Sequence, residues 1–168
     1  MKGILYGVGV GPGDPELMTL KAVRLIKENE VIAVPGEKAE YTVAYKFAVQ
    51  AVPELAEKEL LSLHMPMTHD REELERNHEK AAETVISVLE QGKHVIFLTL
   101  GDPVIYSTFS YVQKRVEKRG YKTGIVSGIT SFCAAGARLN TPLVEWNEPL
   151  HVLPAVHRLE SDLDQPGT

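Results

Sequence analysis

The chain has 168 residues, of which 43% are hydrophobic and 24% are charged, and its formal net charge is -5. This size and composition predict a globular protein with one ordinary core and material for a second, smaller unit at its end. The charged residues are spread along the chain, which argues against disorder. The negative net charge argues against a nucleic-acid partner, because a phosphate backbone requires a concentrated basic surface.

The beginning of the chain predicts no targeting segment, since Met1-Lys2 leads into a strand-like run and then into glycines from Gly7 onward. No apolar stretch is long enough to span a bilayer, so we expect no membrane partner. The single cysteine, Cys133, excludes an internal disulfide and fits a reducing, cytoplasmic compartment. Its alanine-rich surroundings favour a buried, unreactive thiol over a nucleophile.

Short apolar runs alternate with longer segments of helical period, a pattern typical of repeated strand-helix-strand units. We therefore predict an α/β fold with a mostly parallel sheet and helices on both faces. The expected strands are Ile4 to Val8, Val31 to Val34, Glu59 to Leu63, Val95 to Leu100 and Gly124 to Val126. The expected helices are Thr19 to Glu28, Tyr41 to Val49, Arg71 to Gln91, Thr108 to Lys118 and Ser131 to Leu139.

The densest basic run lies at the end of the fourth expected helix and just beyond it. It consists of Lys114, Arg115, Lys118, Arg119 and Lys122. Uncharged and acidic residues interrupt it, so we interpret it as a solvated helix face and not as a phosphate-binding patch.

The first informative motif is the glycine-dense segment Gly7 to Pro15, directly after the first expected strand. It matches neither the dinucleotide-binding fingerprint nor a P-loop. Two interpretations stay open. One is a tight turn before a capped helix, with Asp14 or Thr19 as the cap and Pro15 in the first turn. The other is a loop whose backbone approaches a ligand closely.

The second motif, Thr99 to Thr108, follows the most apolar expected strand and precedes a helix. Ligands of open parallel sheets bind at this carboxyl edge, where the connections diverge. Gly101 removes side-chain bulk, and Asp102 offers a carboxylate to hydroxyl or amine groups. Alternatively, Asp102 only ties down the turn by accepting hydrogen bonds from backbone N–H groups.

The third motif, Ser127 to Ala137, also follows a strand and opens a helix of small residues. Small residues allow close packing of the helix or close approach of a ligand. Thr130 and Ser131 can bind a ligand through hydroxyls or exposed N–H groups, or they can simply cap the helix.

Together the three motifs resemble the tetrapyrrole methylase family, the class III methyltransferases. The segments GVGVGPGDPELMTLKAVRLI, FLTLGDPVIYSTFSYV and GITSFCAAGARLNTPLVE are similar to those of the precorrin-2 C(20)-methyltransferases and of their cobalt-factor II counterparts. The resemblance extends from Lys2 to about Ala155. It implies S-adenosylmethionine-dependent C-methylation of a corrin precursor at C-20, in cobalamin biosynthesis.

The resemblance also implies which residues form the site. The cofactor would be bound by Pro12, Leu100, Gly101, Asp102, Ile105, Thr130 and Ser131. Asp14 would face the tetrapyrrole trough. A base that removes the displaced proton is not identified, and Asp102 is a weak candidate for that role. The six histidines show no spacing of a known zinc site, so we expect no metal.

The resemblance further implies two domains and, as is common in the family, a homodimer. Residues 1–145 would form the N-terminal α/β domain, with the trough and part of the cofactor pocket. Residues 146–168 would form the linker and the incomplete beginning of the C-terminal domain, with Leu150 to Leu153 as its opening strand. The chain departs from the family at Ser127, where proline is usual, and we expect most of the second domain to be missing.

Two alternatives remain at this point. The chain could be a different member of the family, such as a methylase for diphthamide or ribosomal RNA. It could also be a truncated fragment that binds ligand without turnover, in which case exposed apolar surface would promote association.

Overall fold

The computed structural model describes residues 1–153, and these divide between two compact units, one of residues 1–131 and one that begins at residue 132. The first unit is a five-stranded sheet in the order β3-β2-β4-β1-β5, and every strand pair is parallel. The strands are β1 (Ile4–Gly9), β2 (Val31–Pro35), β3 (Glu59–Leu63), β4 (Val95–Thr99) and β5 (Lys122–Val126). The predicted parallel α/β fold is confirmed.

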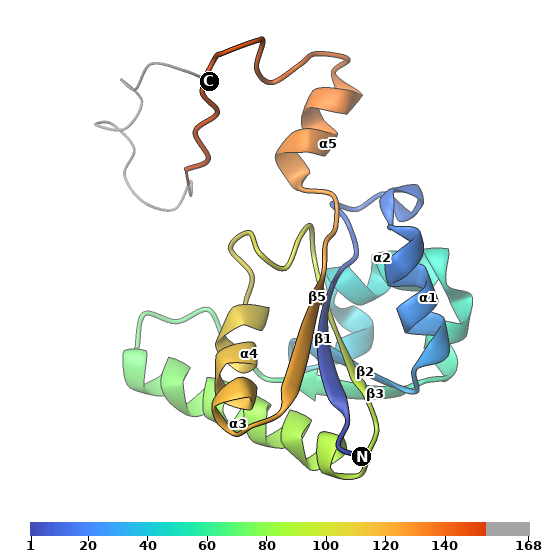
Figure 1. Cartoon of the computed structure of the whole chain (residues 1–168), viewed down its shortest axis with the longest axis vertical. Coiled ribbons are helices and arrows are strands. Elements are labelled where there is room, and N and C mark those ends of the chain that lie inside the picture. Colours follow the sequence, from blue (N-terminus) through green and yellow to red (C-terminus); the bar gives the residue numbers. More distant parts are fainter. Residues whose placement is uncertain (154–168) are drawn as a thin grey trace. The chain divides into compact units, whose positions relative to one another are not determined.

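Helices cover both faces of this sheet (Figure 1). They are α1 (Leu20–Glu28), α2 (Val43–Ala51), α3 (Arg71–Glu90) and α4 (Phe109–Lys118), with short 3₁₀ turns at Pro15–Leu17, Ala39–Tyr41 and Pro53–Glu57. Successive strand residues point to opposite faces, so Val8, Ile96 and Leu98 pack with α1 and α2, whereas Leu5 and Phe97 pack with α3 and α4. All five residues of β4 are buried, as expected of a strand covered on both faces.

The predicted helix beginning at Tyr41 starts two residues later, at Val43. The reason is local. Residues Ala39–Tyr41 form a 3₁₀ turn, and the Thr42 hydroxyl then caps α2 by accepting the Tyr45 N–H at 3.3 Å. Thr19 caps α1 in the same way, through the Ala22 N–H at 3.2 Å. Asp14 caps the preceding 3₁₀ turn by accepting the Glu16 N–H at 2.9 Å, so both expected caps are present.

The basic run at α4 is only partly the solvated face that we predicted. Lys114 and Lys118 are exposed, but Arg115 and Arg119 turn toward α3 and pair with its glutamates. The helices pack side by side, and acidic residues four apart on α3 meet basic residues four apart on α4.

Helix α5 (Ser131–Arg138), all but its first residue in the second unit, buries only Gly136. A Cβ atom at Gly136 would lie 3.1 Å from the Thr141 carbonyl oxygen, because the following segment returns over that point of the helix. Two expectations fail in this region. Cys133 is exposed, since no described residue of this unit covers its side of α5. Leu150 to Leu153 form no strand, since no strand within residues 132–153 pairs with them.

Candidate functional site

Three loops meet at the carboxyl edge of the sheet, after the adjacent strands β4, β1 and β5. The Gly101 N–H donates to the Gly11 carbonyl oxygen at 2.8 Å, and the two glycines form an isolated antiparallel bridge. The Val10 N–H donates to the Thr99 carbonyl oxygen at 2.9 Å. Backbone hydrogen bonds therefore hold together the first two glycine-containing motifs, although 90 residues of sequence separate them.

Glycines are required where these loops touch. A Cβ atom at Gly128 would lie 2.0 Å from the Gly101 carbonyl oxygen, and one at Gly9 would lie 2.4 Å from the same atom. Any larger residue would push the loops apart. The glycine density that left a turn and a ligand loop equally open is thus explained first by contact between loop backbones.

Asp102 joins the second loop to the third. The residue is buried, with 7% exposure. Its Oδ1 atom accepts the Val104 N–H at 2.8 Å, and its Oδ2 atom accepts the Gly128 N–H at 3.0 Å. Sequence reasoning raised the first of these roles, a carboxylate that ties down its own turn, but nothing in the sequence indicated the link to Gly128, 26 positions away.

Thr130 presents a buried polar atom to the same region. Its Oγ1 atom is buried, and it has no hydrogen-bond partner within the part of the chain that the structure describes. A buried hydroxyl without a partner is costly, so such an atom is typical of a site completed by a ligand. Leu100, Ile105 and Ser131 are exposed at this edge, and Pro12 is half-buried.

The other half of the carboxyl edge, after β2 and β3, carries residues that the sequence did not single out. The Lys38 ammonium lies 5.7 Å from the centroid of the Tyr41 ring. A hollow of about 290 Å³ is lined by Glu37, Lys38, Tyr41 and Thr42. Glu37 also lies 3.9 Å from His64 Nδ1, which connects the loop after β2 with the loop after β3.

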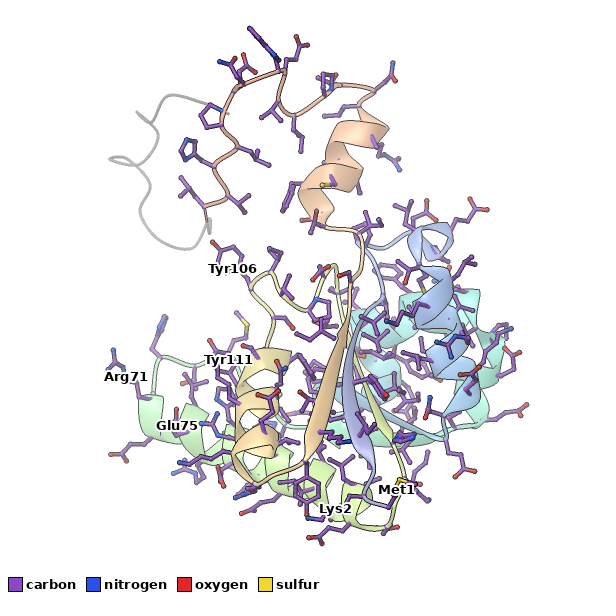
Figure 2. All side chains as sticks on the ribbon, in the orientation of Figure 1. Met1, Lys2, Arg71, Glu75, Tyr106 and Tyr111 are labelled. Carbon is purple, nitrogen blue, oxygen red and sulfur yellow. The ribbon has the colours of Figure 1, made fainter. Side chains whose placement is uncertain are left out.

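Large apolar side chains are exposed along this edge, on the loops that follow the strands. They are Tyr41, Met67, Leu100, Val104, Ile105, Tyr106 and Ile129. Figure 2 shows Tyr106 on the loop between β4 and α4, above Tyr111 of that helix. Exposed apolar residues on neighbouring loops are typical of binding surfaces.

Neither a metal site nor a membrane-spanning helix is present within residues 1–153. No group of three or more histidine, cysteine, aspartate or glutamate side chains is arranged to hold a metal ion there. Of the helices in that range, none combines the length and the apolar character needed to cross a membrane.

A parallel α/β unit with three interlocked loops at its carboxyl edge is typical of the class of proteins that bind ligands where the strands end. Comparison with known proteins identifies the class more closely. The family model described as Tetrapyrrole (Corrin/Porphyrin) Methylases matches residues 4–167. The chain belongs to the tetrapyrrole methylase family, whose members are S-adenosylmethionine-dependent methyltransferases.

Individual relatives agree with this assignment. The chain is 43% identical, over 162 residues, to a probable cobalt-precorrin-2 C(20)-methyltransferase of Methanocaldococcus jannaschii, covering 96% of this chain and 68% of the relative. It is 32% identical to the cobalt-precorrin-2 C(20)-methyltransferase of Salmonella typhimurium, covering 91% of this chain and 64% of the relative. The chain thus spans about two thirds of the length of these curated relatives.

A solved structure of a related methyltransferase has a similar fold. The uroporphyrin-III C-methyltransferase of Thermus thermophilus, complexed with S-adenosylhomocysteine, superposes with a TM-score of 0.60 at 26% identity. The match covers 86% of this chain and 51% of that one.

Proposed function

We propose that this chain takes part in the S-adenosylmethionine-dependent methylation of precorrin-2 or cobalt-precorrin-2 at C-20, a step of cobalamin biosynthesis. The observation that carries the proposal is the 43% identity to a probable cobalt-precorrin-2 C(20)-methyltransferase along 96% of the chain. The interlocked loops at the carboxyl edge of the sheet support it, because they lie where this class of fold binds ligands.

The residues at that edge fit the cofactor. The group would supply a methyl carried on a positively charged sulfur. The buried Thr130 Oγ1 atom would gain the partner that it lacks within residues 1–153, and Ser131 would add a second hydroxyl. Pro12, Leu100, Gly101, Asp102 and Ile105 would complete the pocket. These assignments are part of the proposal.

The main role of Asp102 in this proposal is to hold two loops in place. Each of its carboxylate oxygens already accepts a backbone N–H, so the side chain is better placed to fix the loops than to remove a proton. Methyl transfer by in-line displacement depends on holding donor and acceptor in line and keeping water out. A rigid pair of loops serves that purpose, and we assign no general base.

The apolar edge fits the substrate class. A tetrapyrrole is a broad, flat, largely apolar ring with carboxylates at its margin, so it suits a surface of exposed aromatic and aliphatic side chains. Val104 and Tyr106 are exposed on the loop after β4, the strand that pairs with β2 in the sheet. Asp14, which caps a 3₁₀ turn and is exposed, is retained as a substrate-facing residue.

The proposal includes the remaining expectations. They are a domain boundary near residue 145, a second-domain segment at 146–168, a homodimer and a cytoplasmic location. Residues 154–168 lie outside the described part of the chain.

Calorimetric titration with S-adenosylhomocysteine tests the proposal, followed by turnover assays with precorrin-2 and cobalt-precorrin-2. The chain should be compared with one extended by a second domain from a full-length relative. We expect binding by both chains and methylation of one of the two substrates by the extended chain. Absence of binding and of turnover in both chains would refute the proposed function.

A further inference from the structure

The loop between β2 and α2 forms a small surface hollow that is separate from the glycine loops. Its walls are Glu37, Lys38, Tyr41 and Thr42, and its volume is about 290 Å³, room for several molecules the size of water, at about 30 Å³ each. The Gly36 N–H donates to the Leu63 carbonyl oxygen at 2.8 Å, and the Ala39 N–H donates to Ser62 Oγ at 2.9 Å. The neighbouring strand β3 therefore holds this loop in place.

The charge of Lys38 is not neutralised within this hollow. Among residues 1–153, the Lys38 ammonium interacts only with the face of the Tyr41 ring. Glu37, the acidic residue of the hollow, faces His64 instead, at 3.9 Å. Tyr41 itself is 70% exposed, so the pair presents an ammonium group and an aromatic surface side by side.

The position of the hollow relates it to the proposed substrate. In the strand order β3-β2-β4-β1-β5, the glycine loops occupy the β4, β1 and β5 end of the carboxyl edge. The loops after β2 and β3 occupy the other end, and β4, whose loop carries Val104 and Tyr106, is the direct neighbour of β2. A broad ligand bound at the glycine loops and extending along the edge past β4 would bring its margin to the loop after β2.

We propose that Lys38 and Tyr41 form a subsite for one peripheral carboxylate of the tetrapyrrole. This inference rests on the proposed function. The Lys38 ammonium binds the carboxylate, and the Tyr41 ring packs against the apolar part of the same substituent. Glu37 repels that carboxylate and so weakens the subsite, which gives the two neighbouring charges opposite effects on binding.

The stable octacarboxylate uroporphyrin III serves as the probe. Its binding to the full chain is measured by the quenching of uroporphyrin fluorescence. Lys38→Met should raise the dissociation constant about fivefold, as expected of one partly exposed charge pair, and should lower its dependence on salt. Glu37→Gln should lower the dissociation constant. Tyr41→Ala should weaken binding, whereas Tyr41→Phe keeps the ring and should retain it.

Lys21→Met is the matched control. Lys21 also has no ion-pair partner within residues 1–153, but it lies on α1 and lines a different groove, together with Tyr6 and His94. Its replacement should leave uroporphyrin binding unchanged. Titration with S-adenosylhomocysteine checks that each variant is folded and that its glycine loops still bind the cofactor product.

Each result decides the matter. A Lys38→Met variant that binds uroporphyrin as tightly as the parent, or a Glu37→Gln variant that binds it more weakly, would overturn the subsite. If the parent binds S-adenosylhomocysteine but not uroporphyrin, the subsite fails while the cofactor assignment stands. If the parent binds neither, the proposed function fails with it.

Discussion

Two carboxylates at the carboxyl edge show how burial decides what an aspartate does. Asp14 and Asp102 each follow a glycine and each accept a backbone N–H two residues ahead. Asp14 is exposed and caps one turn, whereas Asp102 is buried and also receives the Gly128 N–H. The same side chain is therefore a local cap in one loop and a link between loops in the other.

We expect Asp102→Asn to lower the free energy of unfolding by about 2 kcal/mol, because the amide NH₂ group would face a buried backbone donor. Asp14→Asn should cost less than about 0.5 kcal/mol, since asparagine caps as well as aspartate. Urea denaturation of both variants measures the difference. Equal losses would show that the link to Gly128 contributes nothing to stability.

Gly128→Ala tests the contact between loop backbones. The added Cβ atom would meet the Gly101 carbonyl oxygen, so we expect a loss of about 3 kcal/mol and weaker binding of S-adenosylhomocysteine. Gly120 provides the control, because its φ is +79° but no heavy atom lies within 4 Å of a Cβ there. Gly120→Ala should cost only the strain of a left-handed backbone, about 1 kcal/mol, and should leave ligand binding unchanged.

At the scale of elements, α3 and α4 are joined by a ladder of charges. Arg115 pairs with Glu75 and Glu79, and Arg119 pairs with Glu79 and Glu83. The Arg115 side chain is only 18% exposed, so its guanidinium is less screened than most surface charges. Figure 2 shows Glu75 on α3, near α4 and its residue Tyr111.

We expect Arg115→Gln to lower the free energy of unfolding by about 1 kcal/mol, the upper range for a partly exposed network. Lys114→Gln, one residue away and exposed, should change it by less than half of that. Thermal unfolding in low and in 1 M salt distinguishes a loss of charge pairing from a loss of packing. If the Arg115 effect does not shrink in high salt, it comes from lost packing and not from charge.

The same helix pair contains a buried histidine. His78 is stacked on Tyr111, with the ring centroids 4.5 Å apart and the planes 6° from parallel, and its Nδ1 atom has no partner within residues 1–153. Burial lowers the pKa of His78 below its usual value of 6.5, and the nearby Arg115 lowers it further, against a smaller opposing effect of Glu75. The folded protein therefore resists protonation at this position.

This shift makes stability depend on pH in one direction. The unfolded chain binds a proton at His78 as the pH falls through 6.5, whereas the folded chain does not until a lower pH, so the free energy of unfolding decreases over that interval. His78→Phe keeps a stacked ring and removes the titration, and it should reduce the decrease between pH 7 and 5.5. Tyr111→Phe keeps both the stacked ring and the histidine, and the decrease in stability at low pH should therefore remain. An unchanged slope in His78→Phe would assign the pH dependence to other groups.

At the scale of the molecule, the periodicity of hydrophobic residues predicted the strands and helices of the fold. It did not predict the contacts between loops that form the site. The five strands were predicted to within two residues, most directly β2 and β4, which are apolar runs, and least directly β5, whose first residues Lys122 and Thr123 are polar. The strand order, the Asp102 to Gly128 bond and the Lys38 to Tyr41 pair depend on which loops become neighbours, and local spacing does not encode that. Cys133 was predicted to be buried because its neighbours are small, yet small residues only permit close packing and do not supply a partner.

The strand order also has a consequence for how the chain is made. β1 leaves the ribosome well before its neighbours in the sheet, β4 and β5, which begin at residues 95 and 122. Until then its buried residues Leu5 and Val8 have no partner strand on either side. We therefore expect nascent chains that end before Val95 to remain sensitive to protease throughout, and protection of the amino terminus to appear in one step once residue 126 has emerged.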